Sequence, residues 1–192
     1  SKHYSLLTDV LKQESDLYDA LRHTKTPLGV SLAKCLKTGI DNRGHPMVKT
    51  VGLIAGDEHC YDSFSRLFHP VIERRFGEGC LAGSHAKPIS LSGLTATRAD
   101  PSATYVLSTQ VRSARCLQGF RFPPAVSKDE RQEVERLLVS ALQKLEGEAG
   151  GEYLPLRGSQ SFTGKPGGMT EEQETELRAA RLLFEWPDAP TA

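Results

Sequence analysis

The chain has 192 residues, of which 38% are hydrophobic and 25% are charged, with 24 basic against 24 acidic side chains. This composition is typical of a globular protein and excludes a disordered or fibrous chain, and the length suffices for one large domain or two small ones. A formal net charge of zero argues against nucleic acid as a partner, because nucleic-acid binding depends largely on basic surfaces. A membrane partner is not expected either, since no apolar run approaches the roughly 18–20 residues that cross a bilayer.

Short helical patterns, interrupted by glycine and proline, fill residues 1 to about 100, without sustained β alternation. Apolar side chains at helical spacing predict one helix within Asp16–Thr24 and a second from Val30 that ends at Gly39. A third helix is expected after Asp57, with a kink or a break at Pro70, because proline removes a backbone donor. The pattern therefore predicts an all-α domain over residues 1–100, whose end is a linker rich in glycine and serine.

The segment Thr38–Pro46 is dense in turn-forming residues and predicts an exposed loop. It brings the polar side chains of Asp41, Asn42 and His45 close together in the sequence. The residues alone leave two interpretations open. They form either a polar binding site or a turn in which the Asp and Asn side chains bond their own backbone.

The four cysteines lie far apart in the sequence, without a C-x-x-C pair or a histidine at zinc-finger spacing. This spacing predicts neither a metal site nor a redox motif, although the even count permits two disulfides. We interpret all four as thiols with small buried side chains in a cytoplasmic protein. The first residues also lack the charged-then-apolar pattern of a secretory signal. The cysteines are Cys35, Cys60, Cys80 and Cys116.

After residue 100 the pattern changes to strand, helix, strand, helix. Alternating β-branched and aromatic residues predict a strand within Tyr105–Phe122, and Glu152–Gly158 predicts a second one. Capping-box patterns at Ser127 and Thr170 start two helices, the second of which is expected to run to about Phe184. The first of these helices carries an apolar stripe formed by Val134, Leu137, Leu138, Ala141, Leu142 and Leu145.

A two-stranded sheet leaves unpaired edges and is marginally stable alone. We therefore expect an α+β fold in which residues 101–192 are part of a larger α/β domain, whose open edge is covered by another chain or by a missing part. Arg112, Arg115 and Arg121 lie on or beside the first predicted strand. They form either a phosphate-binding set or a solvated face.

Four segments, in order and at compatible spacing, resemble the phosphagen (guanidino) kinases, and among them creatine kinase. They run from Cys35 to Pro46, from Lys49 to Glu58, from Tyr105 to Arg115 and from Gly119 to Pro124. The resemblance implies a small all-α N-terminal domain followed by a domain built on an antiparallel sheet, of which residues 101–192 would be a truncated beginning. It also implies transfer of the ATP γ-phosphoryl group to a guanidine such as creatine.

In the family, the loop that matches Leu36–Ile40 closes over the guanidino substrate, with aliphatic side chains beside it. The resemblance therefore implies a substrate-loop-like segment in this chain, with Leu36 and Ile40 as its aliphatic contacts. The residues of this segment are Leu36, Gly39, Ile40, Asp41, Asn42 and His45.

The nucleotide side of the resemblance departs from the family pattern. Gln110 stands where the family motif S-S-R-V-R has its first arginine, so Arg112 is the remnant of that phosphate-binding pair. Arg181 stands where the family has a histidine beside the adenine. The family's guanidinium-binding carboxylate, reactive cysteine and further arginines belong to a part that this sequence lacks. We therefore expect no catalytic residue, no metal and no cofactor.

These departures favour a pseudoenzyme: a non-catalytic creatine-kinase-like module that binds another protein or forms a homodimer. The alternative is a fragment or half of a guanidino kinase, for which MgATP would be the cofactor. A third hypothesis is a guanidine sensor that uses Leu36, Ile40 and the His45 loop without chemistry.

Overall fold

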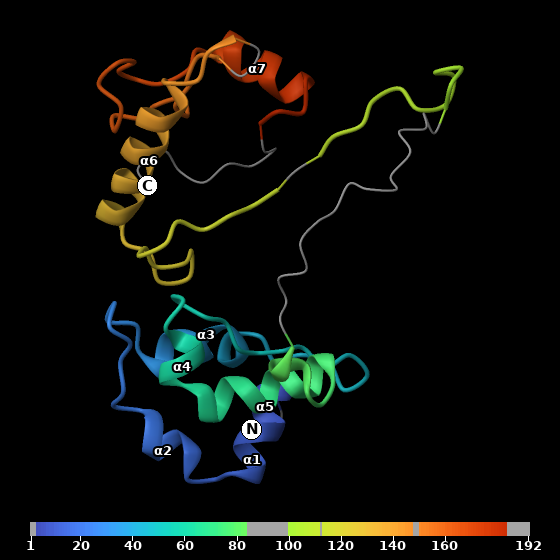
Figure 1. The fold of residues 1–192 in the computed structure, drawn as a ribbon, viewed down its shortest axis with the longest axis vertical. Helices are drawn as coiled ribbons and strands as arrows, with labels where there is room; N and C mark the ends of the chain where they lie inside the picture. The colour runs from blue at the N-terminus through green and yellow to red at the C-terminus, as the bar shows by residue number, and fades with distance from the viewer. Residues whose placement is uncertain (1–2, 84–99, 112, 148–149, 184–192) are drawn as a thin grey trace. The chain divides into compact units, whose positions relative to one another are not determined.

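A computed structural model describes residues 3–83, 100–111, 113–147 and 150–183 of the chain. These residues form helices and connecting segments, with no strand among them (Figure 1). Two compact units are distinguished: one comprises residues 1–55 and 59–118, the other residues 56–58 and 119–192. The boundary predicted at residue 100 falls inside the first unit, and the domains 1–100 and 101–192 stay a prediction.

The first unit is helical, as predicted. Its α1 packs against α5, and the predicted helix within Asp16–Thr24 is confirmed as α2. Helix α1 was not predicted, and it begins where the Ser5 side chain accepts a hydrogen bond from the Thr8 amide. The elements are α1 (Leu6–Gln13), α2 (Leu17–Leu21), α3 (Leu32–Asp41), α4 (Cys60–Ser63), α5 (Ser65–Phe76) and the 3₁₀ turn η1 (Cys80–Ala82). Its core includes Leu7, Val10, Leu17, Leu32, Cys35, Leu36, Cys60, Phe64, Leu67, Phe68 and Val71.

The third predicted helix is divided into two helices, α4 and α5, but the break does not lie at Pro70, where it was predicted. Pro70 lies inside α5, and α4 ends at Ser63 because the backbone of Phe64 leaves the helical conformation, with φ −117° and ψ 28°. The Phe64 side chain is fully buried. The predicted cap at Asp57 is also wrong, because His59 precedes α4 without a side-chain cap bond.

Helix α3 continues past Gly39, which was predicted to end it, and closes at Asp41. Gly39 is needed there for another reason: a Cβ at this position would lie 2.2 Å from the backbone oxygen of Gly52. The chain at Gly52 therefore touches the α3 backbone itself. The Ile54 amide, two residues on, donates to the Cys35 carbonyl of α3 at 3.1 Å. Close backbone approach is one of the roles that only glycine can fill.

The second unit contains α6 (Lys128–Leu142) and α7 (Glu171–Ala179), and both predicted capping boxes are confirmed. The Ser127 hydroxyl accepts from the Glu130 amide while the Glu130 carboxylate accepts from the Ser127 amide, and Thr170 and Gln173 repeat this pattern. Helix α7 is shorter than predicted. It ends at Ala179, and Arg181 takes a positive φ of 56°, which a continuing helix does not allow.

The two strands predicted within Tyr105–Phe122 and Glu152–Gly158 are not found in the described part of the chain. The alternating residues of the first are almost fully exposed, with Tyr105, Leu107 and Val111 at 87–90%. A strand needs a neighbouring strand to satisfy its backbone groups, and alternation alone does not supply one. The antiparallel sheet of the fold prediction is therefore unconfirmed.

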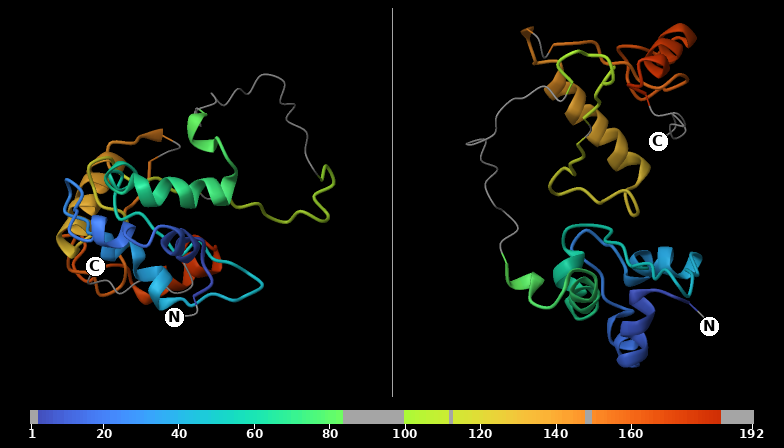
Figure 2. Two further views of the ribbon diagram at one scale, coloured as in Figure 1. Left: turned by 90° about the horizontal axis from the view of Figure 1, so that it is seen from below. Right: turned by 90° about the vertical axis from the view of Figure 1, so that its right-hand side faces the viewer.

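Few side chains of the second unit are buried. In both units the helices are short and joined by irregular segments (Figure 2). Among the described residues 119–183, the buried ones are Ala125, Val139, Pro155, Ser159 and Met169. No described helix is both long and apolar enough to span a bilayer.

Candidate functional site

The substrate-loop-like segment begins in the last turns of α3. Leu36 is buried in the core of its unit at 4% exposure, whereas Ile40 is 63% exposed. Helical spacing explains the difference, because α3 turns Leu36 toward the core together with Leu32 and Cys35. Of the two aliphatic side chains assigned to the substrate, Ile40 is the one that a ligand can reach.

Backbone hydrogen bonds anchor the loop after α3 at both of its ends. The Tyr4 amide donates to the Arg43 carbonyl at 2.8 Å, and the Thr50 amide donates to the Tyr4 carbonyl at 3.3 Å. The Leu6 amide in turn donates to the Thr50 carbonyl at 2.9 Å. Residues 45–49, between these anchors, have exposed side chains.

The polar residues of the loop make local bonds. Lys37 Nζ and Asp41 Oδ2 form an exposed ion pair at 2.6 Å. The side chains of Asn42 and His45 each accept a hydrogen bond from the backbone amide two residues further on, at 2.9 and 3.1 Å. The turn in which Asp and Asn side chains bond their own backbone is therefore present at Asn42 but not at Asp41, which pairs with Lys37, and His45 makes such a bond without having been predicted to. A binding role of Asp41, Asn42 and His45 stays a prediction.

Exposed apolar side chains lie beside this turn. Ile40, Met47 and Val48 are 63%, 84% and 67% exposed. Such side chains can shield an apolar group of a ligand from water. In the part of the chain that the structure describes, no cluster of His, Cys, Asp or Glu side chains could hold a metal ion.

The two described nucleotide-related positions belong to different units. Gln110 is exposed on the extended segment before residue 112, in the first unit. Arg181 is exposed just after α7, in the second unit. Arg112 lies outside the described residues, so its predicted phosphate-binding role stays a prediction.

Arg121, one of the three arginines on the predicted first strand, is held by a carboxylate. Its Nε donates to both oxygens of Glu130 at 2.8 and 3.0 Å, and a second guanidinium nitrogen lies 2.6 Å from Glu130 Oε2. The Arg121 guanidinium and the Ser127 capping bonds lower the pKa of Glu130 to about 2. Arg121 therefore fixes the start of α6 in this structure.

The depressed pKa of Glu130 predicts a loss of stability in acid. Because the folded pKa is below the ordinary value, this contribution is complete above about pH 5 and is lost as the pH falls toward 2. Glu130→Gln should lower the free energy of unfolding by about 1 kcal/mol at pH 7 and flatten its decline between pH 5 and pH 3. Urea denaturation followed by circular dichroism measures both. Glu172→Gln, at an exposed position of α7, is the control, and an equal effect there would contradict the prediction.

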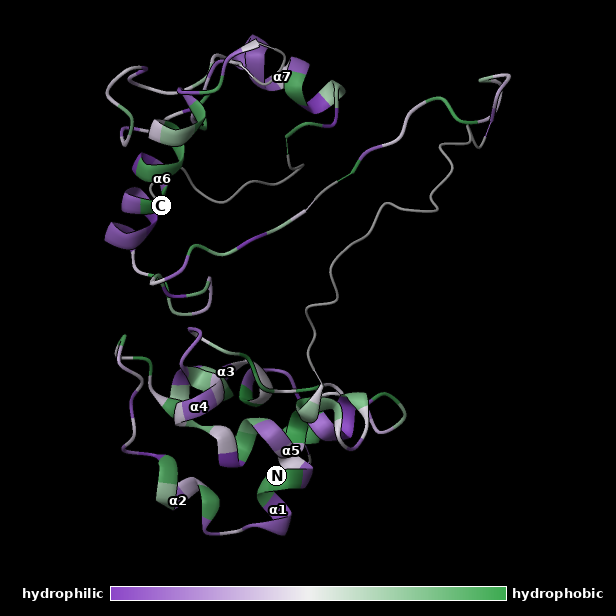
Figure 3. Ribbon diagram, in the orientation of Figure 1, coloured by the Kyte–Doolittle hydropathy of each residue, from purple (hydrophilic) through white to green (hydrophobic). Residues whose placement is uncertain are grey.

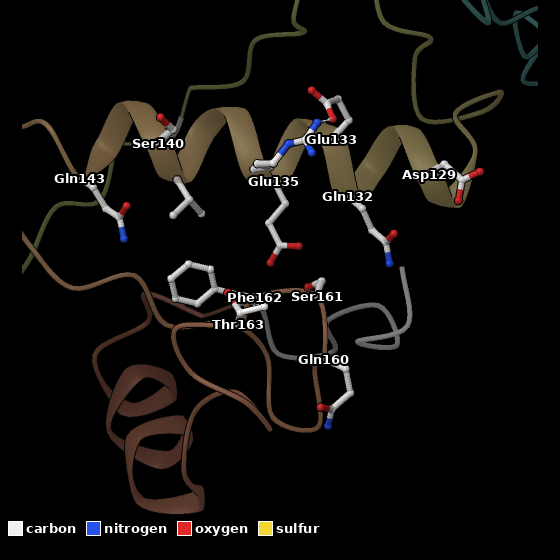
Figure 4. Close-up of a pocket in the computed structure, with 12 residues that line it drawn as sticks. Asp129, Gln132, Glu133, Glu135, Ser140, Gln143, Gln160, Ser161, Phe162 and Thr163 are labelled. Atoms are coloured by element: carbon white, nitrogen blue, oxygen red, sulfur yellow. Dashed lines mark ion pairs between the residues drawn. The ribbon is translucent and has the colours of Figure 1, made fainter.

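Sequence reasoning missed a groove of about 650 Å³ between α6 and residues 160–163 (Figure 4). Its centre is formed by Glu135, which accepts a hydrogen bond from the Tyr153 hydroxyl at 2.7 Å. Burial, followed by this bond, raises the pKa of Tyr153. The ring of Phe162 packs edge-on against Tyr153 at 5.2 Å. The sequence signal was present, since the groove side of α6 repeats Gln132, Glu135, Val139 and Gln143 at helical spacing.

Residues 1–73 match the family model of the ATP:guanido phosphotransferase N-terminal domain. The predicted resemblance to the phosphagen (guanidino) kinase family is confirmed. Over 190 residues, 99% of its length, the chain is 40% identical to M-type creatine kinase of Gallus gallus. Over the same length it is 38% identical to the flagellar creatine kinase of Strongylocentrotus purpuratus.

Solved structures agree with this assignment. The chain is similar to lombricine kinase, with 31% identity, a TM-score of 0.68 and 98% of this chain covered. It is also similar to the duplicated taurocyamine kinase from Schistosoma mansoni, with 29% identity, a TM-score of 0.67 and 98% of this chain covered. It spans 46% of the chicken enzyme and 15% of the sea-urchin protein. Of the lombricine and taurocyamine kinase chains it covers 47% and 24%.

Proposed function

We propose that this chain is a creatine-kinase-like module that does not transfer phosphoryl groups itself and acts by binding a second polypeptide in the cytoplasm. The partner is another protein or a second copy of the chain. The observation that carries the proposal is the exposed apolar face of α6. A globular unit that leaves its most apolar helix face in water is suited to binding.

The apolar stripe of α6 lies on the side opposite the groove. Leu137, Leu138 and Leu142 are 44–50% exposed, and Leu145, just beyond the helix, is 46% exposed. Helical spacing places Leu137 and Leu138 about 160° and 100° around the helix from Val139, which is 4% exposed, and Leu142 at the edge of the stripe, about 60° from Val139. Figure 3 shows the hydrophilic start of α6 and the more hydrophobic turns that follow. The unit therefore packs the polar face of α6 and leaves the apolar face uncovered.

The extended segment over residues 105–111 supports the same proposal. Its apolar side chains are exposed, and residues 105–111 are not part of a strand in the described structure. An exposed extended segment can add as a strand to the sheet edge of a partner. Burial of three such side chains would release roughly 1.5–3 kcal/mol each before ordering costs.

The absence of phosphoryl transfer is proposed from the departures at Gln110 and Arg181. Stabilising the charge on transferring phosphate requires several cations at fixed positions. Loss of one such partner costs on the order of 10²–10³ in rate. Gln110 is neutral at a position where the family pattern has an arginine, and we therefore propose that MgATP is not used as a cofactor.

A coupled assay with ATP and creatine tests the catalytic part of the proposal. We expect no turnover above background from the purified chain, with chicken M-type creatine kinase as positive control. Gln110→Arg alone should not produce activity, because one cation does not supply the others. Turnover that disappears in Arg112→Ala would refute the proposal and favour a kinase.

A further inference from the structure

Two cysteines that lie far apart in the sequence meet in the core of the first unit. Cys35 lies on α3 and Cys60 is the first residue of α4. Their Sγ atoms are 3.7 Å apart, and both residues are completely buried. The two thiols are reduced in the structure. The other two cysteines differ, since Cys80 is half-buried and Cys116 is exposed.

Backbone hydrogen bonds on both helices fix the positions of the two cysteines. The Cys35 carbonyl accepts from the Ile54 amide at 3.1 Å, and the Cys60 carbonyl accepts from the Phe64 amide at 3.1 Å. A disulfide requires sulfurs about 2.05 Å apart, so the pair must close by less than 2 Å. Helix α4 is four residues long and α3 is ten, so α4 can supply this movement more easily than α3.

We propose that Cys35 and Cys60 are a modification site: an internal dithiol that a small hydroperoxide converts into a disulfide. One thiol reacts with the peroxide to give a sulfenic acid and water. The second thiol attacks that sulfur, the S–S bond forms, and a second water leaves. In sum, two thiols and one hydrogen peroxide give one disulfide and two waters.

The disulfide has a defined structural consequence. It joins α3, which carries Leu36 and Ile40, to the start of α4, and it closes the loop between residues 35 and 60. Closing a loop of this length restricts the unfolded chain. The oxidised chain should therefore melt roughly 5–10 °C higher than the reduced one. It should also hold the substrate-loop-like segment more rigidly at its α3 end.

Peptide mapping after peroxide treatment of the whole chain tests the proposal without any variant. Trypsin releases Cys35 within residues 35–37 and Cys60 within residues 50–66. We expect these two peptides to be linked under non-reducing conditions, about 2 Da lighter than their sum, and separated by dithiothreitol. Cys80→Ala/Cys116→Ala, which keeps the pair, should give the same linked peptide and the same rise in melting temperature.

The matched variant Cys35→Ala/Cys60→Ala should lose both responses to peroxide. Oxidation confined to Cys80 or Cys116, or a Cys35–Cys60 link that does not raise the melting temperature, overturns the proposal. Native labelling with N-ethylmaleimide adds a check on burial. It should modify Cys116 before Cys35 or Cys60, and the reverse order overturns the proposal as well.

Discussion

Gly39→Ala is expected to destabilise the first unit by about 2 kcal/mol. The new Cβ would lie 2.2 Å from the backbone oxygen of Gly52, and an overpacked contact costs about 1–3 kcal/mol or more. Alanine normally favours a helix over glycine by about 1 kcal/mol, which opposes this cost but is smaller. The neighbouring backbone cannot simply withdraw, because Ile54 is hydrogen-bonded to Cys35 of α3. Urea denaturation followed by circular dichroism measures the change.

A second glycine provides the matched control. At Gly83 the backbone has φ −90°, which any residue adopts, and the nearest atom to a new Cβ is 4.0 Å away. Gly83→Ala should therefore change the free energy of unfolding by less than about 0.5 kcal/mol. If the Gly39→Ala variant is as stable as the Gly83→Ala variant, the α3 backbone does not pack against Gly52 as closely as the structure shows.

The two capping-box helix starts were the most predictable part of the fold, because a capping box is a local interaction, whereas the start of α1 was missed and the cap predicted at Asp57 was wrong. The boxes at Ser127 and Thr170 need side chains and amides only three residues apart, and both are present. Helix ends were predicted less well. Gly39 has the residue type of a helix stop, but its lack of a Cβ serves a contact with Gly52, thirteen residues away in the sequence. A single sequence does not contain that contact.

The strand predictions failed because, unlike a helix cap, a strand depends on hydrogen bonds to a segment far away in the sequence. The alternation in Tyr105–Phe122 describes a chain that suits a sheet, not one that has found a partner. The apolar stripe of α6 shows the same limit. Its spacing predicted the helix correctly, but burial of Leu138 and Leu142 depends on a covering surface that the described residues do not provide.

The sequence identified residues of the candidate site, but it did not reveal which of them are buried, exposed or bonded to their own backbone. Turn chemistry alone anticipated the self-bonded side chain of Asn42, but not the similar bond of His45 or the pairing of Asp41 with Lys37. The resemblance placed Leu36 and Ile40 together, but helical geometry separates them into a core residue and an exposed one. The groove beside Glu135 was missed because Tyr153 and Phe162 reach α6 from an irregular segment without periodicity.

Leu138→Glu/Leu142→Glu is expected to weaken association through α6 by at least roughly a hundredfold. Burying each leucine contributes roughly 1.5–3 kcal/mol, and a buried, unpaired glutamate adds a further cost. The chain alone should lose little stability, because both side chains are about half exposed in it. Sedimentation equilibrium over a concentration series measures self-association. Binding of an apolar fluorescent dye reports the exposed face independently of any partner, and it should fall in the variant.

Val139→Ala provides the contrast that separates binding from folding. This side chain is 4% exposed, so its truncation should lower the stability of the second unit by about 1–2 kcal/mol and leave dye binding and association unchanged. Two distinct phenotypes from one helix are therefore expected. If the glutamate variant instead unfolds like the alanine variant while its association persists, Leu138 and Leu142 belong to the chain's own core. The binding role of α6 would then have to be abandoned.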